Sequence, residues 1–229
     1  MLSDSLLRKL PTSSIKNCVI IPRPGKNFYS MRVEIEKNFI DISKYKVIGL
    51  LIGTNDISDW VFCQHGRVGY RENLKWFPVP KVEVTWDRIL KNFEAFIDAI
   101  RVKNPGAVLV ISSIIPRLGD WEWSRDACIA LSDSIQEWCC KQQAQGLSVI
   151  FTPTHKFFLK NGKPMPELFW KDGIHLSAAG LGRVRQSLQQ ALSDSNLQMG
   201  GAWKRRPQGR GPSPGNVRTG VRVGNNIMF

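Results

Sequence analysis

Four short apolar runs recur along this chain, and none of them alternates regularly with polar residues. They cover residues 18–21, 46–52, 107–111 and 147–151. A strand with one face in water alternates apolar and polar side chains, whereas a strand covered on both faces is apolar throughout. The runs therefore predict strands buried between two layers of other structure.

Segments with apolar residues at helical spacing lie between and after these runs. The segment 86–100 has this spacing and ends before Asn104-Pro105-Gly106, which stops a helix. A second segment covers 128–138, and a third begins at Ser177, a favourable N-cap, and continues to Leu192. Alternating strands and helices predict a parallel sheet with helices on both faces, whose ligands bind beyond the carboxyl ends of the strands.

Composition excludes several classes of protein. Of 229 residues, 42% are hydrophobic, which is too many for a disordered chain, and no run of apolar residues is long enough to span a membrane. The start of the chain shows no signal peptide, so we expect a cytoplasmic protein. The five cysteines form no CxxC pair, so we expect no disulfide framework and no zinc cluster. The sequence also contains no P-loop and no dinucleotide-binding glycine motif, and we expect no cofactor.

The net charge of +13 is unevenly distributed. We predict one domain over residues 1–193 and a disordered tail over 194–229, rich in Gly, Pro and Arg. The part of the tail from Gly200 onward has no acidic residue, and its basic residues are Lys204, Arg205, Arg206, Arg210, Arg218 and Arg222. Two interpretations stay open: a solvated tail, or a contact with RNA or DNA.

The segment 57–82 interrupts the strand–helix pattern. It combines aromatic residues, among them Trp60, Tyr70 and Trp76, with Gly, Pro and charged residues. We expect an irregular loop over the binding edge. Its aromatic side chains could pack on the body of the domain, form a substrate lid or stack on nucleic-acid bases.

The residues at strand ends and helix starts include every group that ester hydrolysis needs. Ser5 begins a short helix and is the candidate nucleophile, because free N–H groups there favour a developing negative charge. His175 could take its proton, and Asp172 could orient the His175 ring. The Asn55 amide and the backbone N–H groups of Gly25 and Ser5 could bind the oxyanion.

These residues stand in blocks that resemble those of the SGNH, or GDSL, hydrolase family. The blocks are Ser3-Asp4-Ser5-Leu6, Gly25, Gly53-Thr54-Asn55-Asp56 and Asp172-Gly173-Ile174-His175. The resemblance covers residues 1–192. It implies a flavodoxin-like, three-layer α/β/α sandwich and an ester or acyl hydrolase that needs no metal. It also implies that Ser5, Asp172 and His175 form the catalytic triad and that Gly25 and Asn55 form the oxyanion hole.

Two features depart from the family pattern. Ser3 replaces the glycine of the first block, and only Met1-Leu2 precedes that block where the family has a central strand. We therefore expect the first strand to be largely missing, in a member that is retroelement-encoded or truncated at its N-terminus.

Three hypotheses stay open on the sequence alone. The first is a serine esterase that hydrolyses, or transfers the acyl group of, a small-molecule ester. The second is an SGNH-like module with weak or no activity that binds RNA or DNA through its basic surface and tail. The third is an inactive fragment that begins at an internal methionine.

Overall fold

The computed structural model describes residues 1–7, 19–65, 83–118 and 122–198. In this part of the chain, five strands form one parallel sheet in the order β2-β1-β3-β4-β5. The strands are β1 (Leu2–Ser3), β2 (Ile21–Pro22), β3 (Val47–Leu51), β4 (Val108–Ser112) and β5 (Val149–Thr152). The last three match the predicted apolar runs to within two residues at either end, whereas β2 overlaps its run at Ile21 alone.

The first strand is as short as expected, yet it lies inside the sheet. Leu2 pairs with Ile21 of β2 on one side and with Leu50 of β3 on the other. Met1 and Leu2 are fully buried. Two residues of β1 are therefore enough to set the register of the segment that follows them, which contains Ser5.

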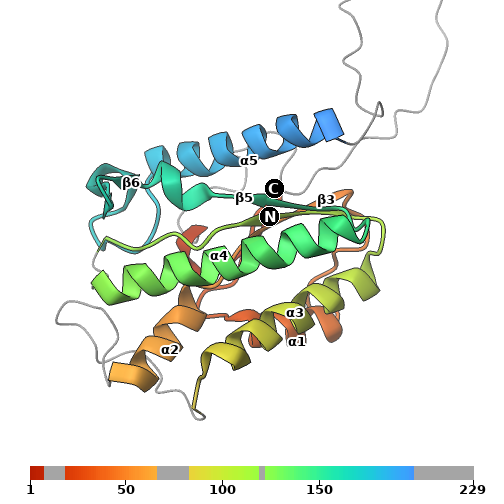
Figure 1. The fold of residues 1–229 in the computed structure, drawn as a ribbon, viewed down its shortest axis with the longest axis horizontal. Helices are drawn as coiled ribbons and strands as arrows, with labels where there is room; N and C mark the ends of the chain where they lie inside the picture. Colours follow the sequence, from red (N-terminus) through yellow and green to blue (C-terminus); the bar gives the residue numbers. More distant parts are fainter. Residues whose placement is uncertain (8–18, 66–82, 119–121, 199–229) are drawn as a thin grey trace, which may run out of the picture.

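Helices cover both faces of the sheet, which confirms the predicted α/β/α sandwich (Figure 1). The α-helices of the described residues are α1 (Phe28–Glu36), α2 (Thr54–His65), α3 (Trp86–Lys103), α4 (Glu122–Ala144) and α5 (Ala178–Gln198). Alternate residues of β3 point to opposite cores: Ile48 packs with α1, α3 and α4, whereas Val47 packs with α5. The uniformly apolar strand sequence follows from this burial on both faces.

Several short elements connect β5 to α5 and approach the carboxyl edge of the sheet. They are the 3-10 helices η4 (Thr154–Phe157) and η5 (Pro166–Leu168) and the two-stranded ribbon of β6 (Leu159–Lys160) and β7 (Lys163–Pro164). A further 3-10 helix, η1 (Ser5–Leu7), follows β1. None of the helices in the described ranges is both long and apolar enough to cross a bilayer.

Two sequence-based predictions need correction. Residues 57–65 belong to α2 and not to an irregular loop, because Ile57, Trp60 and Val61 recur at helical spacing and pack on the core. The ring of Trp60 contacts that of Trp86 edge-on, with centroids 5.3 Å apart. Residues 66–82 lie outside the described residues. In addition, α5 continues to Gln198, past the predicted end of the domain at residue 193. The rest of the predicted tail, residues 199–229, also lies outside the described residues.

Candidate active site

Three of the five predicted site residues follow neighbouring strands of the sheet. Ser5 follows β1, Gly25 follows β2 and Asn55 follows β3, so all three lie at the same edge of the sheet. Neighbouring strands lie about 4.8 Å apart, so the strand ends that these residues follow are close together. Hydrogen bonds between the loops fix them further: the Arg23 N–H donates to the Ser3 carbonyl at 2.7 Å.

Asp4 holds the turn that carries Ser5. Its side chain is fully buried and accepts hydrogen bonds from the Leu6 N–H at 3.0 Å, the Thr54 N–H at 3.3 Å and the Thr54 hydroxyl. The carboxylate thereby joins the end of β1 to the start of α2. Burial raises the pKa of Asp4, and the Thr54 and Leu6 hydrogen bonds and the charge of Arg117 oppose this rise.

The two predicted oxyanion residues are joined through Lys26. The Asn55 amide donates to the Lys26 carbonyl at 2.8 Å, and Lys26 directly follows Gly25. An amide nitrogen carries two hydrogens, so this bond orients Asn55 and leaves its second hydrogen for another acceptor. Gly25 has φ of +74°, a left-handed conformation that suits glycine, and a Cβ atom there would meet nothing within 4 Å.

Asp172 and His175 are in direct side-chain contact. One Asp172 oxygen lies 2.9 Å from His175 Nδ1, and the other accepts the N–H groups of Ile174 and His175, both at 3.0 Å. A carboxylate at Nδ1 favours the tautomer that carries the proton there. The other ring nitrogen, Nε2, is buried and makes no hydrogen bond with the described residues.

The His175 loop lies against the Ser5 turn. The Leu176 N–H donates to the Leu6 carbonyl at 3.1 Å, so the residues that follow His175 and Ser5 are in direct backbone contact. This contact brings the beginning of the described chain and a segment about 170 residues later to one edge of the sheet. Ser5 itself is partly exposed, as a nucleophile that meets a substrate must be.

Two apolar side chains flank the His175 loop, and sequence reasoning did not identify either of them. The Leu118 N–H donates to the Gly173 carbonyl at 3.0 Å, and the Trp170 N–H donates to the His175 carbonyl at 2.8 Å. Leu118 is 37% exposed and Trp170 is 44% exposed. By contrast Trp123, near the start of α4, packs partly buried against the core.

Buried carboxyl groups lie beneath the site. Asp56 accepts the Phe28 N–H with both oxygens, at 3.2 and 3.1 Å, and thereby joins α2 to α1. Burial raises the pKa of Asp56 well above its usual value, and the charges of Asp59 and Asp4 raise it further. The sequence identified the Gly53–Asp56 block, but the burial of these groups depends on contacts between distant segments.

A second serine–histidine pair lies at the ends of β4 and β5. Ser113 Oγ is 2.9 Å from His155 Nδ1 and accepts the His155 N–H at 2.8 Å. Ser113 is fully buried and His155 is 8% exposed, and burial lowers the pKa of His155. An inaccessible hydroxyl cannot attack a substrate, so this pair joins two strand ends and is not a second nucleophilic site.

Two other sequence-based predictions concern metals and the tail. Among the side chains that the structure describes, no three of His, Cys, Asp or Glu gather as a metal-binding group. The six basic tail residues proposed to contact RNA or DNA lie within 199–229, outside the described residues. Nothing in the comparisons below supports nucleic-acid binding.

The parallel sheet with polar groups at its carboxyl edge is consistent with the SGNH hydrolase fold. A model of the GDSL-like lipase/acylhydrolase family matches residues 7–182. The chain therefore belongs to this family of hydrolases. The matched range includes Gly25, Asn55, Asp172 and His175 and begins just after Ser5.

Solved structures with the same fold come from several bacteria. A GDSL-like lipase from Bacteroides thetaiotaomicron superposes with a TM-score of 0.59 at 12% identity, over 85% of this chain and 86% of that chain. A lipolytic protein of the G-D-S-L family from Veillonella parvula gives 0.55 at 15% identity, over 84% and 96%. A family 3 carbohydrate esterase from Clostridium thermocellum gives 0.53 at 17% identity, over 80% and 73%. A comparison with curated protein sequences found no significant match.

Proposed function

We propose that this chain is a serine esterase in which Ser5, His175 and Asp172 form the catalytic triad. The observation that carries the proposal is the backbone contact between Leu6 and Leu176, because it joins the Ser5 turn to the loop of the Asp172–His175 pair. Membership in the GDSL-like lipase/acylhydrolase family supports the same reaction class.

The reaction begins when His175 Nε2 accepts the proton of the Ser5 hydroxyl while Ser5 Oγ attacks the acyl carbonyl of the ester. Asp172 stabilises the imidazolium that forms. The tetrahedral intermediate collapses, and the alcohol leaves with the proton from His175. Water then attacks the acyl-enzyme with His175 as the base, which releases the acid and restores Ser5.

The oxyanion is stabilised by three donors in this proposal: the Asn55 amide and the backbone N–H groups of Ser5 and Gly25. The Leu6 N–H is not among them, because Asp4 already accepts it. Donors held in place before the reaction stabilise the negative charge without the cost of reorienting water. The bond from Asn55 to the Lys26 carbonyl supplies this prior orientation.

The substrate in this proposal is a small-molecule ester whose acyl group lies against Leu118 and Trp170. Both side chains are exposed, apolar and bonded through their backbones to the His175 loop. An apolar acyl chain that covers them removes apolar surface from water, which stabilises the bound state by about 25 cal/mol per Å².

The direct test is hydrolysis of p-nitrophenyl acetate by the Ser5→Ala and His175→Ala variants. Each variant is expected to lose activity by a factor of about 10⁴ or more, because members of a triad act as a unit. Ser193→Ala is the matched control, since this serine is exposed and its hydroxyl donates to the Gln189 carbonyl of the same helix, α5. Circular dichroism would verify that all variants are folded. Wild-type rates in both Ser5→Ala and His175→Ala would contradict the proposal.

A further inference from the structure

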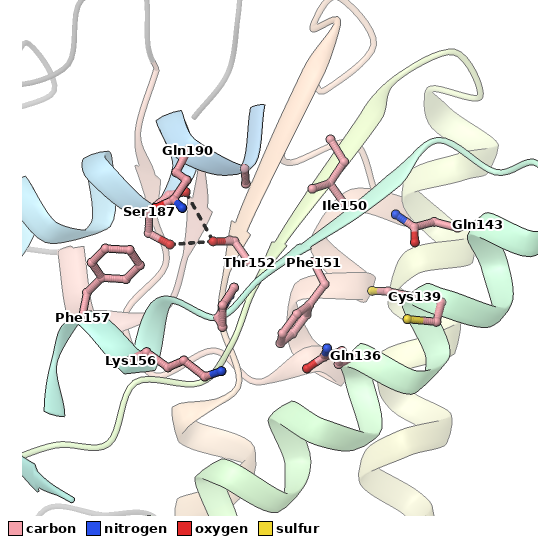
Figure 2. Close-up of a pocket in the computed structure, with 13 residues that line it drawn as sticks. Gln136, Cys139, Gln143, Ile150, Phe151, Thr152, Lys156, Phe157, Ser187 and Gln190 are labelled. Carbon is pink, nitrogen blue, oxygen red and sulfur yellow. Dashed lines mark hydrogen bonds between the residues drawn. The ribbon is translucent and has the colours of Figure 1, made fainter. Parts of the chain in front are cut away.

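A groove opens along the outer edge of β5, between α4 and α5 (Figure 2). Its volume is about 540 Å³, within the range of about 300–1,000 Å³ that is typical of ligand pockets. Its lining combines apolar side chains with amides, including Phe151, Phe157, Gln136, Gln143 and Gln190.

This groove is separate from the candidate active site. In the described sheet β5 is the edge strand, three positions from β1, the strand that leads to Ser5. Strand spacing puts roughly 14 Å between the two strands. The mechanism proposed for Ser5 uses none of the groove residues.

The direction of the β5 backbone groups follows from the bonds to β4. The Ser148 and Thr152 carbonyls accept N–H groups of the β4 segment at 3.0 and 2.9 Å, so the even-numbered residues of this run face β4. In a parallel ladder the intervening residues, Val149 and Phe151, turn their N–H and C=O groups outward. Of these two residues, Phe151 lines the groove.

Of these two outward-facing residues, only Val149 has its N–H and C=O groups hydrogen-bonded to other described residues. The Val149 carbonyl accepts the Gln143 amide at 2.7 Å, and the Val149 N–H donates to the Leu147 carbonyl at 2.9 Å. Phe151 has no such bond from its outward N–H or C=O to any residue that the structure describes. A donor and an acceptor from the same residue thus point together into the groove, as an added strand requires.

The charge of the groove indicates which kind of partner would bind there. Lys156 is the one charged residue among the described residues of its lining, and it makes no salt bridge within the described part of the chain. We propose that the groove binds an extended, acidic segment of a partner protein. Its backbone pairs with Phe151, and one of its carboxylates contacts Lys156.

Two other occupants fit less well. The segment 200–229 of this chain contains no acidic residue. A second copy of the chain carries the same charge of +13, and its β5 edge lies between its own α4 and α5. Two edges that are each flanked by helices cannot approach as closely as a single extended peptide can.

The test uses fluorescence anisotropy with a labelled, end-blocked peptide of alternating Val and Glu residues and the full chain. Lys156→Glu should weaken binding by about tenfold or more, because it replaces an attraction by a repulsion. Gln190→Trp, which fills the groove from the exposed face of α5, should also weaken it. Lys160→Glu is the matched control, since Lys160 is exposed in β6 and does not line the groove; it should bind as the wild type does.

Two altered probes separate the parts of the proposal. A peptide N-methylated at its central residues cannot pair along its backbone and should not bind. A peptide with Lys in place of Glu should also not bind.

Three results would overturn the proposal: no binding of the Val/Glu peptide, equal binding of the N-methylated form, or equal losses of affinity in Lys156→Glu and Lys160→Glu. Displacement of the peptide by a short single-stranded oligonucleotide would overturn it in favour of a nucleic-acid site. Unchanged circular dichroism spectra of the groove variants would show that they remain folded.

Discussion

At the scale of single residues, the side chain of Asp172 has two separate contacts in the site, one with its own loop and one with the His175 ring. One of its oxygens accepts two backbone N–H groups of its own loop, and the other faces His175 Nδ1. The same side chain therefore shapes the loop and orients the ring. Its role in the proposed mechanism is to hold one tautomer of His175.

We predict that Asp172→Asn lowers kcat for p-nitrophenyl acetate by about ten-thousand-fold, because an amide that donates to Nδ1 selects the wrong tautomer. Steady-state kinetics measure this effect. Asp126→Asn, at an exposed position of α4, is the matched control and should retain the wild-type rate. A rate within twofold of the wild type in Asp172→Asn would argue against a triad.

Trp170 provides a second prediction at this scale. We expect Trp170→Ala to leave kcat/KM for acetyl esters nearly unchanged and to lower it by about tenfold for long acyl chains, which lose apolar contact. A series of p-nitrophenyl esters of increasing chain length measures this dependence. Phe39→Ala is a suitable control, because Phe39 is 68% exposed and follows α1, away from the His175 loop. A uniform loss over the series would contradict the predicted acyl contact.

At the scale of elements, the position of α5 depends on one glycine. A Cβ atom on Gly180 would lie 2.2 Å from the carbonyl oxygen of Leu168 in η5, so the helix approaches η5 this closely only without a side chain. Ser177 caps the same turn by accepting the Gly180 N–H at 3.2 Å. Because Ser177 comes two residues after His175, this contact also positions the His175 loop.

We predict that Gly180→Ala destabilises the fold by about 1–3 kcal/mol, since a rigid backbone atom must move. Gly182→Ala is the matched control: it lies in the same helix, and its Cβ would meet nothing within 4 Å. That variant should raise stability by about 1 kcal/mol through helix propensity. Urea denaturation measures both free energies of unfolding. If Gly180→Ala and Gly182→Ala changed the free energy of unfolding in the same direction, this explanation by packing against Leu168 would be contradicted.

At the scale of the whole molecule, the carboxyl edge concentrates buried acidic groups. Asp4 and Asp56 are both nearly inaccessible, and burial raises the pKa of each. A carboxyl group with a raised pKa keeps its proton in the folded state at a pH where the unfolded chain has lost it. Stability therefore falls as pH rises from the ordinary value of 3.8 to the folded-state pKa.

We predict that Asp56→Asn flattens this part of the stability profile, because the amide oxygen can still accept the Phe28 N–H and does not titrate. Urea unfolding of both proteins at a series of pH values above 3.8 measures the difference. The variant should gain stability relative to the wild type as pH rises. A constant difference over the whole range would show that Asp56 does not titrate as its burial implies.

The sequence by itself determined the strands β3, β4 and β5 and the helices α3, α4 and α5, because hydrophobic periodicity is a local property of the chain. It also identified the residue types that form the candidate site. The sequence does not predict the helix α2, although Ile57, Trp60 and Val61 have helical spacing, because the Gly- and Pro-containing residues that follow them interrupt the apolar pattern.

Only the tertiary structure decided which of these residues meet. The burial of Asp4 and Asp56, the apolar rim of Leu118 and Trp170 and the open edge of β5 depend on contacts between segments far apart in the chain. A pattern along the sequence records which face of an element is apolar. Which other segment covers that face is set by packing of the whole sheet, and so are the pKa shifts and the grooves that result.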